Sequence, residues 1–161
     1  MGPSRGGGGL PDPDDDLTPS VVDAGDRWIL PISTREEEQL GEVDQLRIDY
    51  AFTVVISGLL EIRIETEFTL TRDGVVTRFE PEDTASLASL LCLHKAVVQS
   101  ATVSKAGVVR VEFADGRVLT VEPHDQYESC AVHVRRPRGG TWFDLFVPPG
   151  GLAESDFGAA R

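Results

Sequence analysis

Between residues 46 and 70, apolar side chains occupy most even-numbered positions and polar side chains most odd-numbered ones. Eleven large apolar side chains stand at even-numbered positions on the two sides of Gly58. They are Leu46, Ile48, Tyr50, Phe52, Val54, Ile56, Leu60, Ile62, Ile64, Phe68 and Leu70. A period of two places one set of side chains on one face of a strand. The pattern predicts two long strands joined near Gly58, with Phe52 facing Ile62 across the pair.

Shorter hairpins continue this alternation toward the C-terminus. A two-residue Asp73-Gly74 turn places Phe68 opposite Phe79 and Leu70 opposite Thr77. Two three-residue loops, ending at Gly107 and Gly116, then predict a three-stranded meander with apolar faces in register. Its expected cross-strand pairs are Val103 with Val109, Ala101 with Val111, Val111 with Leu119, and Val109 with Val121. A last hairpin is expected between residues of about 130–135 and 142–147.

One amphipathic helix is predicted near residues 83–94. Asp83 is suited to the N-cap, and Leu87, Leu90 and Leu91 are spaced to form one apolar stripe. The helix would cover an apolar face of the sheet or an opening in it.

These elements predict a mainly β (α+β) domain. Strands of twelve residues exceed the usual five or six, so we expect each to bend and the antiparallel sheet to curl. The expected form is barrel-like or sandwich-like, with about eight or nine strands. Residues 27–152 would form this single domain, after a disordered acidic tail over residues 1–26 and before a frayed C-terminus over residues 153–161.

The net negative charge of the chain disfavours some classes of binding partner. The 161 residues include 27 acidic and 15 basic side chains, for a formal net charge of -12. Such an excess disfavours nucleic acids and anionic membranes as partners, because both are bound through Lys and Arg. The chain has no run of 18 apolar residues and no signal-peptide core, so we expect a cytoplasmic protein. Cys92 and Cys130 lie in apolar runs and are expected to be buried thiols.

Five short segments carry a resemblance to a known family: Arg27–Ile32, Leu46–Ala51, Val111–Val121, Tyr127-Glu128 and Pro149–Gly151. Over about residues 27–152 the chain resembles a family of small actinobacterial proteins of unknown function. The resemblance implies a small soluble domain that stands alone. It supplies no catalytic residue and no cofactor.

Three groups of side chains are candidates for chemistry, and the first lies in the loop that follows residue 122. His124, Asp125 and Tyr127 bring together an imidazole, a carboxylate and a phenol. If they converge in a cleft, they suit a hydrolase or a lyase. The alternative is a polar turn in which the tyrosine ring packs on the rim of the core.

The second group lies on the outer face of the long hairpin. Asp49 and Glu65 are expected to face each other there, where they offer two oxygen ligands to a hard cation such as calcium or magnesium. The alternative is an exposed lattice of ion pairs in which Arg47 and Arg63 neutralise both carboxylates.

The third group is a concentration of positive charge in an acidic chain. Arg135, Arg136 and Arg138 precede two glycines at the expected tip of the last hairpin. Such a loop can hold a phosphate or a partner's carboxylates through charge-assisted hydrogen bonds. The alternative is an ordinary exposed hairpin tip.

The sequence lacks His-Glu-x-x-His, Gly-x-Ser-x-Gly and Cys-x-x-Cys patterns, and no cofactor is expected. We therefore expect a binding or protein-interaction module rather than an enzyme, and its acidity suggests that it neutralises a basic protein. One alternative is a small-molecule carrier or sensor with a cavity inside the curled sheet. The other is a hydrolase or lyase that uses the His124 loop. The oligomeric state is left open.

Overall fold

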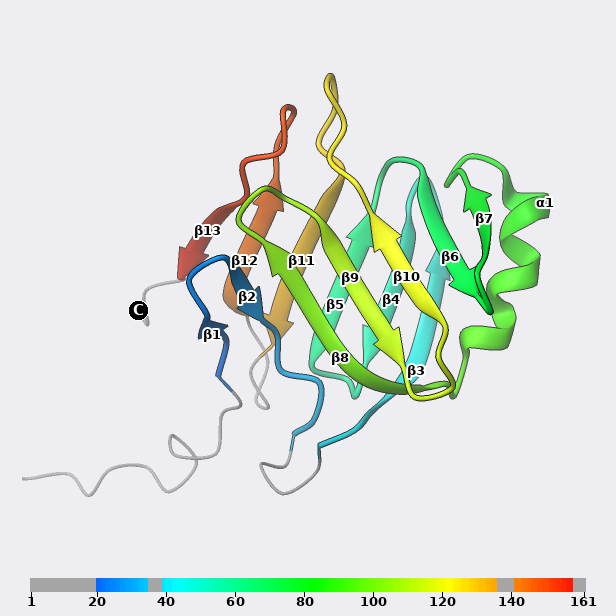
Figure 1. Cartoon of the computed structure of the whole chain (residues 1–161), viewed down its shortest axis with the longest axis horizontal. Coiled ribbons are helices and arrows are strands. Elements are labelled where there is room, and N and C mark those ends of the chain that lie inside the picture. Colours follow the sequence, from blue (N-terminus) through cyan, green and yellow to red (C-terminus); the bar gives the residue numbers. More distant parts are fainter. Residues whose placement is uncertain (1–19, 35–38, 136–140, 158–161) are drawn as a thin grey trace, which may run out of the picture.

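The structure, a computed structural model, describes residues 20–34, 39–135 and 141–157. It shows one antiparallel sheet of thirteen strands and one helical segment (Figure 1). The strands before the helix are β1 (Val22–Asp23), β2 (Arg27–Ile29), β3 (Gly41–Ile48), β4 (Phe52–Ile56), β5 (Leu60–Ile64), β6 (Phe68–Arg72) and β7 (Val75–Phe79). Those after it are β8 (Val97–Ser104), β9 (Val109–Phe113), β10 (Val118–Val121), β11 (Cys130–Arg135), β12 (Thr141–Val147) and β13 (Glu154–Phe157).

Strand β3 joins two runs of strands. Its first two residues pair with β8, as Gly41 does with Val98, and from Val43 onward it pairs with β4, with a bulge between Val43 and Gln45. The spatial order is β13-β12-β11-β5-β4-β3-β8-β9-β10-β6-β7, with β2 also on β8 and β1 on β2. In Figure 1 the run from β8 to β10 lies in front of β11, β5 and β4. Buried side chains from both runs belong to one hydrophobic cluster.

The predicted mainly β, antiparallel class with one helix is confirmed, but the prediction of a curled, barrel-like sheet of eight or nine strands was wrong. The sheet has thirteen strands, ends at β13 and β7, and is neither closed nor strongly curled. The physical reason is a turn inside the first predicted long strand. The Asp49 carboxylate accepts a hydrogen bond from the Ala51 N–H at 2.8 Å, and Tyr50 between them is 90% exposed.

Each predicted long strand is therefore two short ones. β3 and β4 form a hairpin in which Ile48 faces Phe52, and β6 leaves β5 to pair with β10. Short strands of ordinary length give no reason for the sheet to curl. Phe52 faces Ile64 rather than Ile62, a shift of two residues that preserves the faces, so all three side chains are buried in the core.

The later hairpins confirm the predicted registers. Across β6 and β7 the two pairs are as expected, Phe68 with Phe79 and Leu70 with Thr77. The four pairs predicted for the meander are found across β8, β9 and β10. β11 and β12 form the expected last hairpin. Alternation combined with a glycine turn therefore sets both the faces and the register.

The helical segment consists of α1 (Thr84–Leu87) and the 3-10 helix η2 (Ala88–Leu93). The Asp83 carboxylate accepts a hydrogen bond from the Ser86 N–H at 3.3 Å, which confirms the predicted N-cap. Leu91 is 58% exposed, so its predicted place on the apolar stripe was wrong. A 3-10 helix has three residues per turn, and the buried side chains accordingly follow a spacing of three: Leu87, Leu90 and Leu93.

Strands also occur near both termini. β1 lies within the predicted tail over residues 1–26, of which residues 1–19 lie outside the described part. It pairs with β2, and Asp23 forms an ion pair with Lys105 at 2.9 Å. β13 pairs with β12 inside the range 153–161, where fraying was predicted. Hydrogen bonding to a neighbouring strand is what orders each of these segments.

Two further expectations concern the burial of the two cysteine thiols and the presence of a membrane-spanning helix. Cys130 is buried as predicted, whereas Cys92 is exposed on η2. Within the described ranges, no helix has both the length and the apolar character needed to cross a membrane.

Candidate functional site

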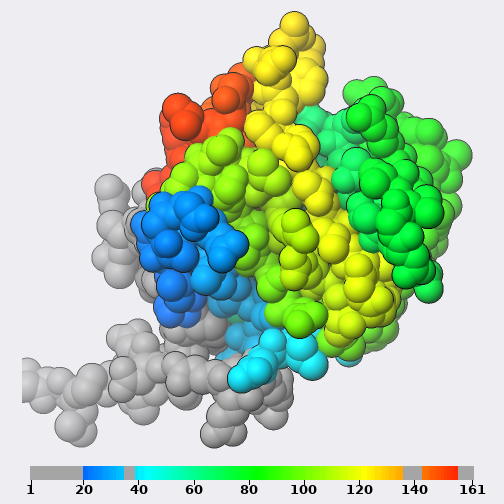
Figure 2. All heavy atoms as spheres, in the orientation of Figure 1, coloured from blue at the N-terminus to red at the C-terminus, as the bar shows by residue number. Residues whose placement is uncertain are grey.

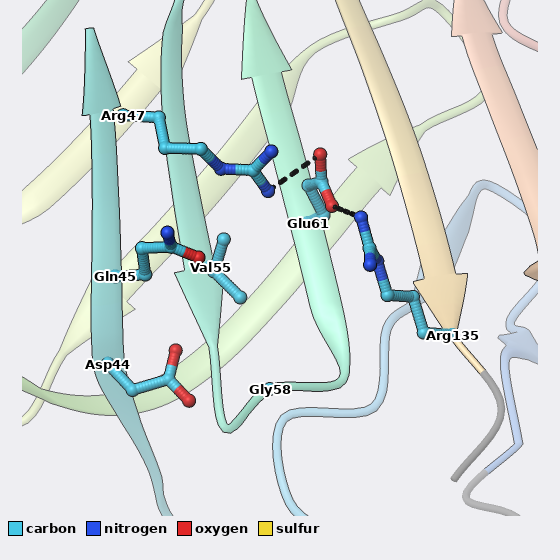
Figure 3. A pocket seen from close by; sticks show the side chains of 7 residues that line it. All are labelled: Asp44, Gln45, Arg47, Val55, Gly58, Glu61 and Arg135. Atoms are coloured by element: carbon cyan, nitrogen blue, oxygen red, sulfur yellow. Dashed lines mark hydrogen bonds and ion pairs between the residues drawn. The ribbon is translucent and has the colours of Figure 1, made fainter. Parts of the chain in front are cut away.

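The outer face of β3, β4, β5 and β11 carries a cavity of about 440 Å³ (Figure 3). On β4, β5 and β11 the even-numbered apolar residues face the core, so the odd-numbered neighbours Val55 and Glu61, which pair across β4 and β5, face outward. The residues that line the cavity are Asp44, Gln45, Arg47, Val55, Gly58, Glu61 and Arg135.

Glu61 is the best-fixed polar side chain of the cavity. It is only 11% exposed, and each of its carboxylate oxygens contacts one guanidinium group. Glu61 Oε1 lies 2.9 Å from Arg47 Nη2, and Oε2 lies 2.5 Å from Arg135 Nη2. Both arginines keep about half of their surface exposed, so they reach from the solvent-facing walls onto a buried carboxylate.

The two arginines determine the charge of this cluster. Burial raises the pKa of Glu61, but the hydrogen bonds from Arg135 and Arg47 together outweigh burial and hold the pKa below its ordinary value. Glu61 is therefore ionised at neutral pH. Two guanidinium groups against one carboxylate leave the cluster with one net positive charge.

One donor of this cluster has no partner among the described residues. Arg47 Nε is buried and makes no hydrogen bond to any part of the chain that the structure describes. A buried donor without an acceptor is costly, and a guanidinium presents five N–H groups to planar anions. Arg47 Nε can therefore donate a hydrogen bond to an oxygen atom of a bound anionic group.

The opposite end of the cavity carries a negative charge. In Figure 3, Asp44 projects from β3 toward the β4–β5 turn at Gly58, away from the contact between Arg47 and Glu61, and Gln45 points toward Val55 between them. Asp44 is exposed, and none of the described residues forms an ion pair with it. The cavity is thus positive at one end and negative at the other.

A histidine and an aspartate continue the same cross-strand row. His133 pairs with Glu61 on one side and with Asp144 on the other, and its Nδ1 contacts Asp144 Oδ1. The imidazole also meets the Phe146 ring edge-on, with ring centroids 6.0 Å apart. His133 is not among the residues that line the cavity, so this pair supports the wall beside Glu61.

Of the three predicted arginines, the structure places Arg135 in the cavity. Arg136 and Arg138 lie outside the described residues. Arg47 and Glu61 were not predicted as site residues. Both stand at odd-numbered positions of the two predicted long strands, so the sequence already indicated that their side chains face outward. Which side chain each one contacts depends on the register of the strands, and the predicted register was not correct.

Asp49 and Glu65 are held by an arginine. Arg63 lies between them, with Nη1 3.3 Å from Asp49 Oδ2 and Nε 3.1 Å from Glu65 Oε1. This is the ion lattice expected as the alternative to a cation site, with Arg63 neutralising both carboxylates while Arg47 pairs with Glu61. In the described ranges, no three His, Cys, Asp or Glu side chains cluster as metal ligands would.

His124, Asp125 and Tyr127 lie in the loop between β10 and β11, which projects from one end of the sheet (Figure 1). The His124 and Tyr127 rings are tilted, with centroids 5.1 Å apart, and His124 Nδ1 accepts a hydrogen bond from the Gln126 N–H at 3.0 Å. Asp125 is exposed, and in the described part of the chain no hydrogen bond joins it to His124. The imidazole therefore serves the turn of this loop.

A second cavity, of about 430 Å³, lies between the β6–β7 hairpin and η2. Its walls are mainly apolar, and the Cys92 thiol within it accepts a hydrogen bond from Arg117 Nη1 at 3.5 Å. Arg117 is itself neutralised by Asp115 at 2.7 Å. The lining residues are Leu70, Arg72, Asp73, Val75, Thr77, Phe79, Ser89, Leu90, Cys92 and Arg117. Because Arg117 is paired with Asp115, this cavity has less unpaired charge for a ligand to bind than the first cavity has.

The two arginines on Glu61 predict how stability depends on pH. A carboxyl whose pKa is lower in the folded state than in the unfolded chain stabilises the fold above the unfolded pKa. This contribution is lost as the pH falls through the folded pKa of Glu61, because protonation breaks both ion pairs. Urea unfolding at pH 7 and at decreasing acidic pH should show the loss for the wild type. The variant Glu61→Gln should be less stable at pH 7 and lose less on acidification; equal slopes for the two proteins would contradict this role.

Comparison with known proteins assigns the chain to a family, but that family has no known activity. Residues 37–145, more than half of the chain, match the model of a family described as a family of unknown function (DUF6188). The matched residues fall within the range over which the resemblance was predicted. No curated protein and no solved structure matches the chain.

Proposed function

Because the chain belongs to the family of unknown function DUF6188, we propose its role from its own geometry: it is a binding module whose ligand occupies the cavity on the outer face of β3, β4, β5 and β11. The observation that carries the proposal is the fixed Glu61 carboxylate between Arg47 and Arg135. Polar groups held in place before a ligand arrives lower the cost of ordering them on binding.

Binding suits this cavity better than catalysis does. A carboxylate with a lowered pKa gives up no proton near neutral pH, and an arginine keeps its charge throughout. The cavity can therefore hold and orient a charged group but has little means to move a proton. Its walls are strands of the sheet, which keep such groups in place better than loops do.

The sequence favoured other ligands and partners, and each stays a proposal. A basic protein is the second candidate, because 27 acidic residues against 15 basic ones favour it as a partner. A small-molecule carrier would use the outer face, since buried side chains fill the inward positions. A hydrolase or lyase would need the exposed His124 loop to close on a substrate. The actinobacterial origin and the cytoplasmic location are likewise proposals.

Filling the cavity tests the proposed function. Val55→Trp places an indole in the cavity, and Val76→Trp places one at an exposed position on β7 as a matched control. The full chain and both variants are isolated under native conditions from the source cells, and native mass spectrometry measures what stays bound. We expect the wild type and the control to retain a ligand or partner that Val55→Trp has lost. Equal retention by all three, or none by the wild type, argues against the proposal.

A further inference from the structure

The cavity that carries the proposed function has opposite charges at its two ends, and this points to the chemistry of its ligand. We infer that the ligand is a small zwitterion, whose carboxylate is held by Arg47 and Arg135 and whose ammonium group is held by Asp44. The inference rests on the proposed function and adds the ligand class. It differs from the basic protein that the overall charge of the chain suggests.

The end of the cavity that would hold the ligand's carboxylate has an excess positive charge and an unused hydrogen-bond donor. Glu61 engages one terminal nitrogen of each arginine, and the cluster keeps one net positive charge. Arg47 Nε is buried and has no acceptor among the residues that the structure describes. A planar carboxylate supplies acceptors to guanidinium groups in a side-by-side geometry, so it satisfies this donor and neutralises the cluster at once.

The ammonium end has the complementary features. Asp44 is exposed, lines the cavity and has no ion pair within the described residues. The neighbouring Gln45 side chain offers a carbonyl oxygen to an N–H donor (Figure 3). An ammonium group bound here would meet one full negative charge and a polar neighbour.

Spacing selects among zwitterions. Asp44 is the extra residue at the bulge of β3, which allows it to share a face with Arg47 three residues further on, at most about 10 Å along the strand. An α-amino acid carries both charged groups on one carbon atom and spans too little of that length. An ω-amino acid or a dipeptide separates the charges by several atoms, and either fits within about 440 Å³.

Three probes with the same four-carbon chain test the inference: 4-aminobutyrate carries both charges, butyrate only the negative one, and butylammonium only the positive one. Each is titrated into the full-length protein, and the shifts of backbone amide NMR signals give Kd. We expect 4-aminobutyrate to bind at least tenfold more tightly than either singly charged probe, with shifts centred on the cavity.

Two variants separate the two ends of the cavity. Arg135→Gln should weaken 4-aminobutyrate and butyrate about equally, whereas Asp44→Asn should reduce 4-aminobutyrate to the affinity of butyrate. Arg110→Gln on β9 and Asp125→Asn in the β10–β11 loop are the matched controls and should leave every affinity unchanged. The NMR spectra themselves show whether each variant is folded.

Other outcomes overturn the inference. Equal affinities for butyrate and 4-aminobutyrate would indicate a purely anionic ligand, and a preference for butylammonium would indicate a cationic one. If no probe shifts the cavity residues while Val55→Trp still loses the retained ligand, the zwitterion is wrong and the proposed function stands. If neither experiment gives its expected result, both proposals fall.

Discussion

Replacing Phe68 by alanine is expected to lower the free energy of unfolding by about 3–5 kcal/mol. Phe68 is fully buried, and its ring stacks on Phe52 at a centroid distance of 5.3 Å and on Phe79 at 5.5 Å. These three rings connect β4 to the β6–β7 hairpin, which lie in different runs of the sheet. Removing the central ring therefore leaves a void and ends both stacking contacts. Urea denaturation followed by fluorescence or circular dichroism measures the loss.

A second substitution on the same hairpin serves as the control. Val76 is exposed on β7, and Val76→Ala should change the free energy of unfolding by no more than about 0.5 kcal/mol. Phe68→Leu, which keeps much of the buried volume, should fall between the two. Losses of similar size for Phe68→Ala and Val76→Ala would show that the stack of three rings does not hold the two runs together.

Gly107→Ala is expected to cost about 2–4 kcal/mol of unfolding free energy. Gly107 lies in the β8–β9 turn with φ at +98°, a value that disfavours a side chain. An added Cβ would also clash with the Gly151 carbonyl oxygen and lie 2.7 Å from Val147 Cγ1. The turn packs against the segment that follows β12, so either the turn or that segment has to move.

Gly116 separates the two causes of this cost. It has nearly the same backbone angle, with φ at +91°, but no atom lies within 4 Å of a Cβ placed there. Gly116→Ala therefore measures the conformational cost alone, about 1 kcal/mol. Both variants are compared by urea denaturation at the same pH. An equal loss for the two would mean that the contact with Gly151 contributes nothing to stability.

Local turn chemistry explains why part of the fold was predictable. Asp73-Gly74 and Gly116 interrupt alternating segments with residues that tolerate a positive φ, so turn and register follow from nearby residues alone. The turn at Asp49 gave no such signal. Tyr50 is apolar and even-numbered, so it continues the alternation although it is exposed. Neither glycine nor proline marks that turn, which depends on a side-chain hydrogen bond from the backbone of Ala51 to Asp49.

The candidate site was predictable only in part, for a related reason. The positive charge at Arg135 is visible in a short stretch of sequence, and the structure places that residue in the cavity. The pairing of Glu61 with Arg47 and Arg135 requires β5 to lie between β4 and β11. In the predicted register Arg47 would have faced Glu67 instead. Contacts between distant strands are decided by the packing of the whole core and leave no local pattern to read.

Glu61 and Arg135 are 74 residues apart in the chain, yet they share one wall of the cavity. A ribosome has to add β11 before β5 gains its second neighbour. Until then the nascent polypeptide displays an unpaired strand edge, of the kind that chaperones shield and that promotes aggregation. A product terminated before residue 130 lacks that strand and one of the two arginines, so the complete cavity arises only after β11 has been synthesised.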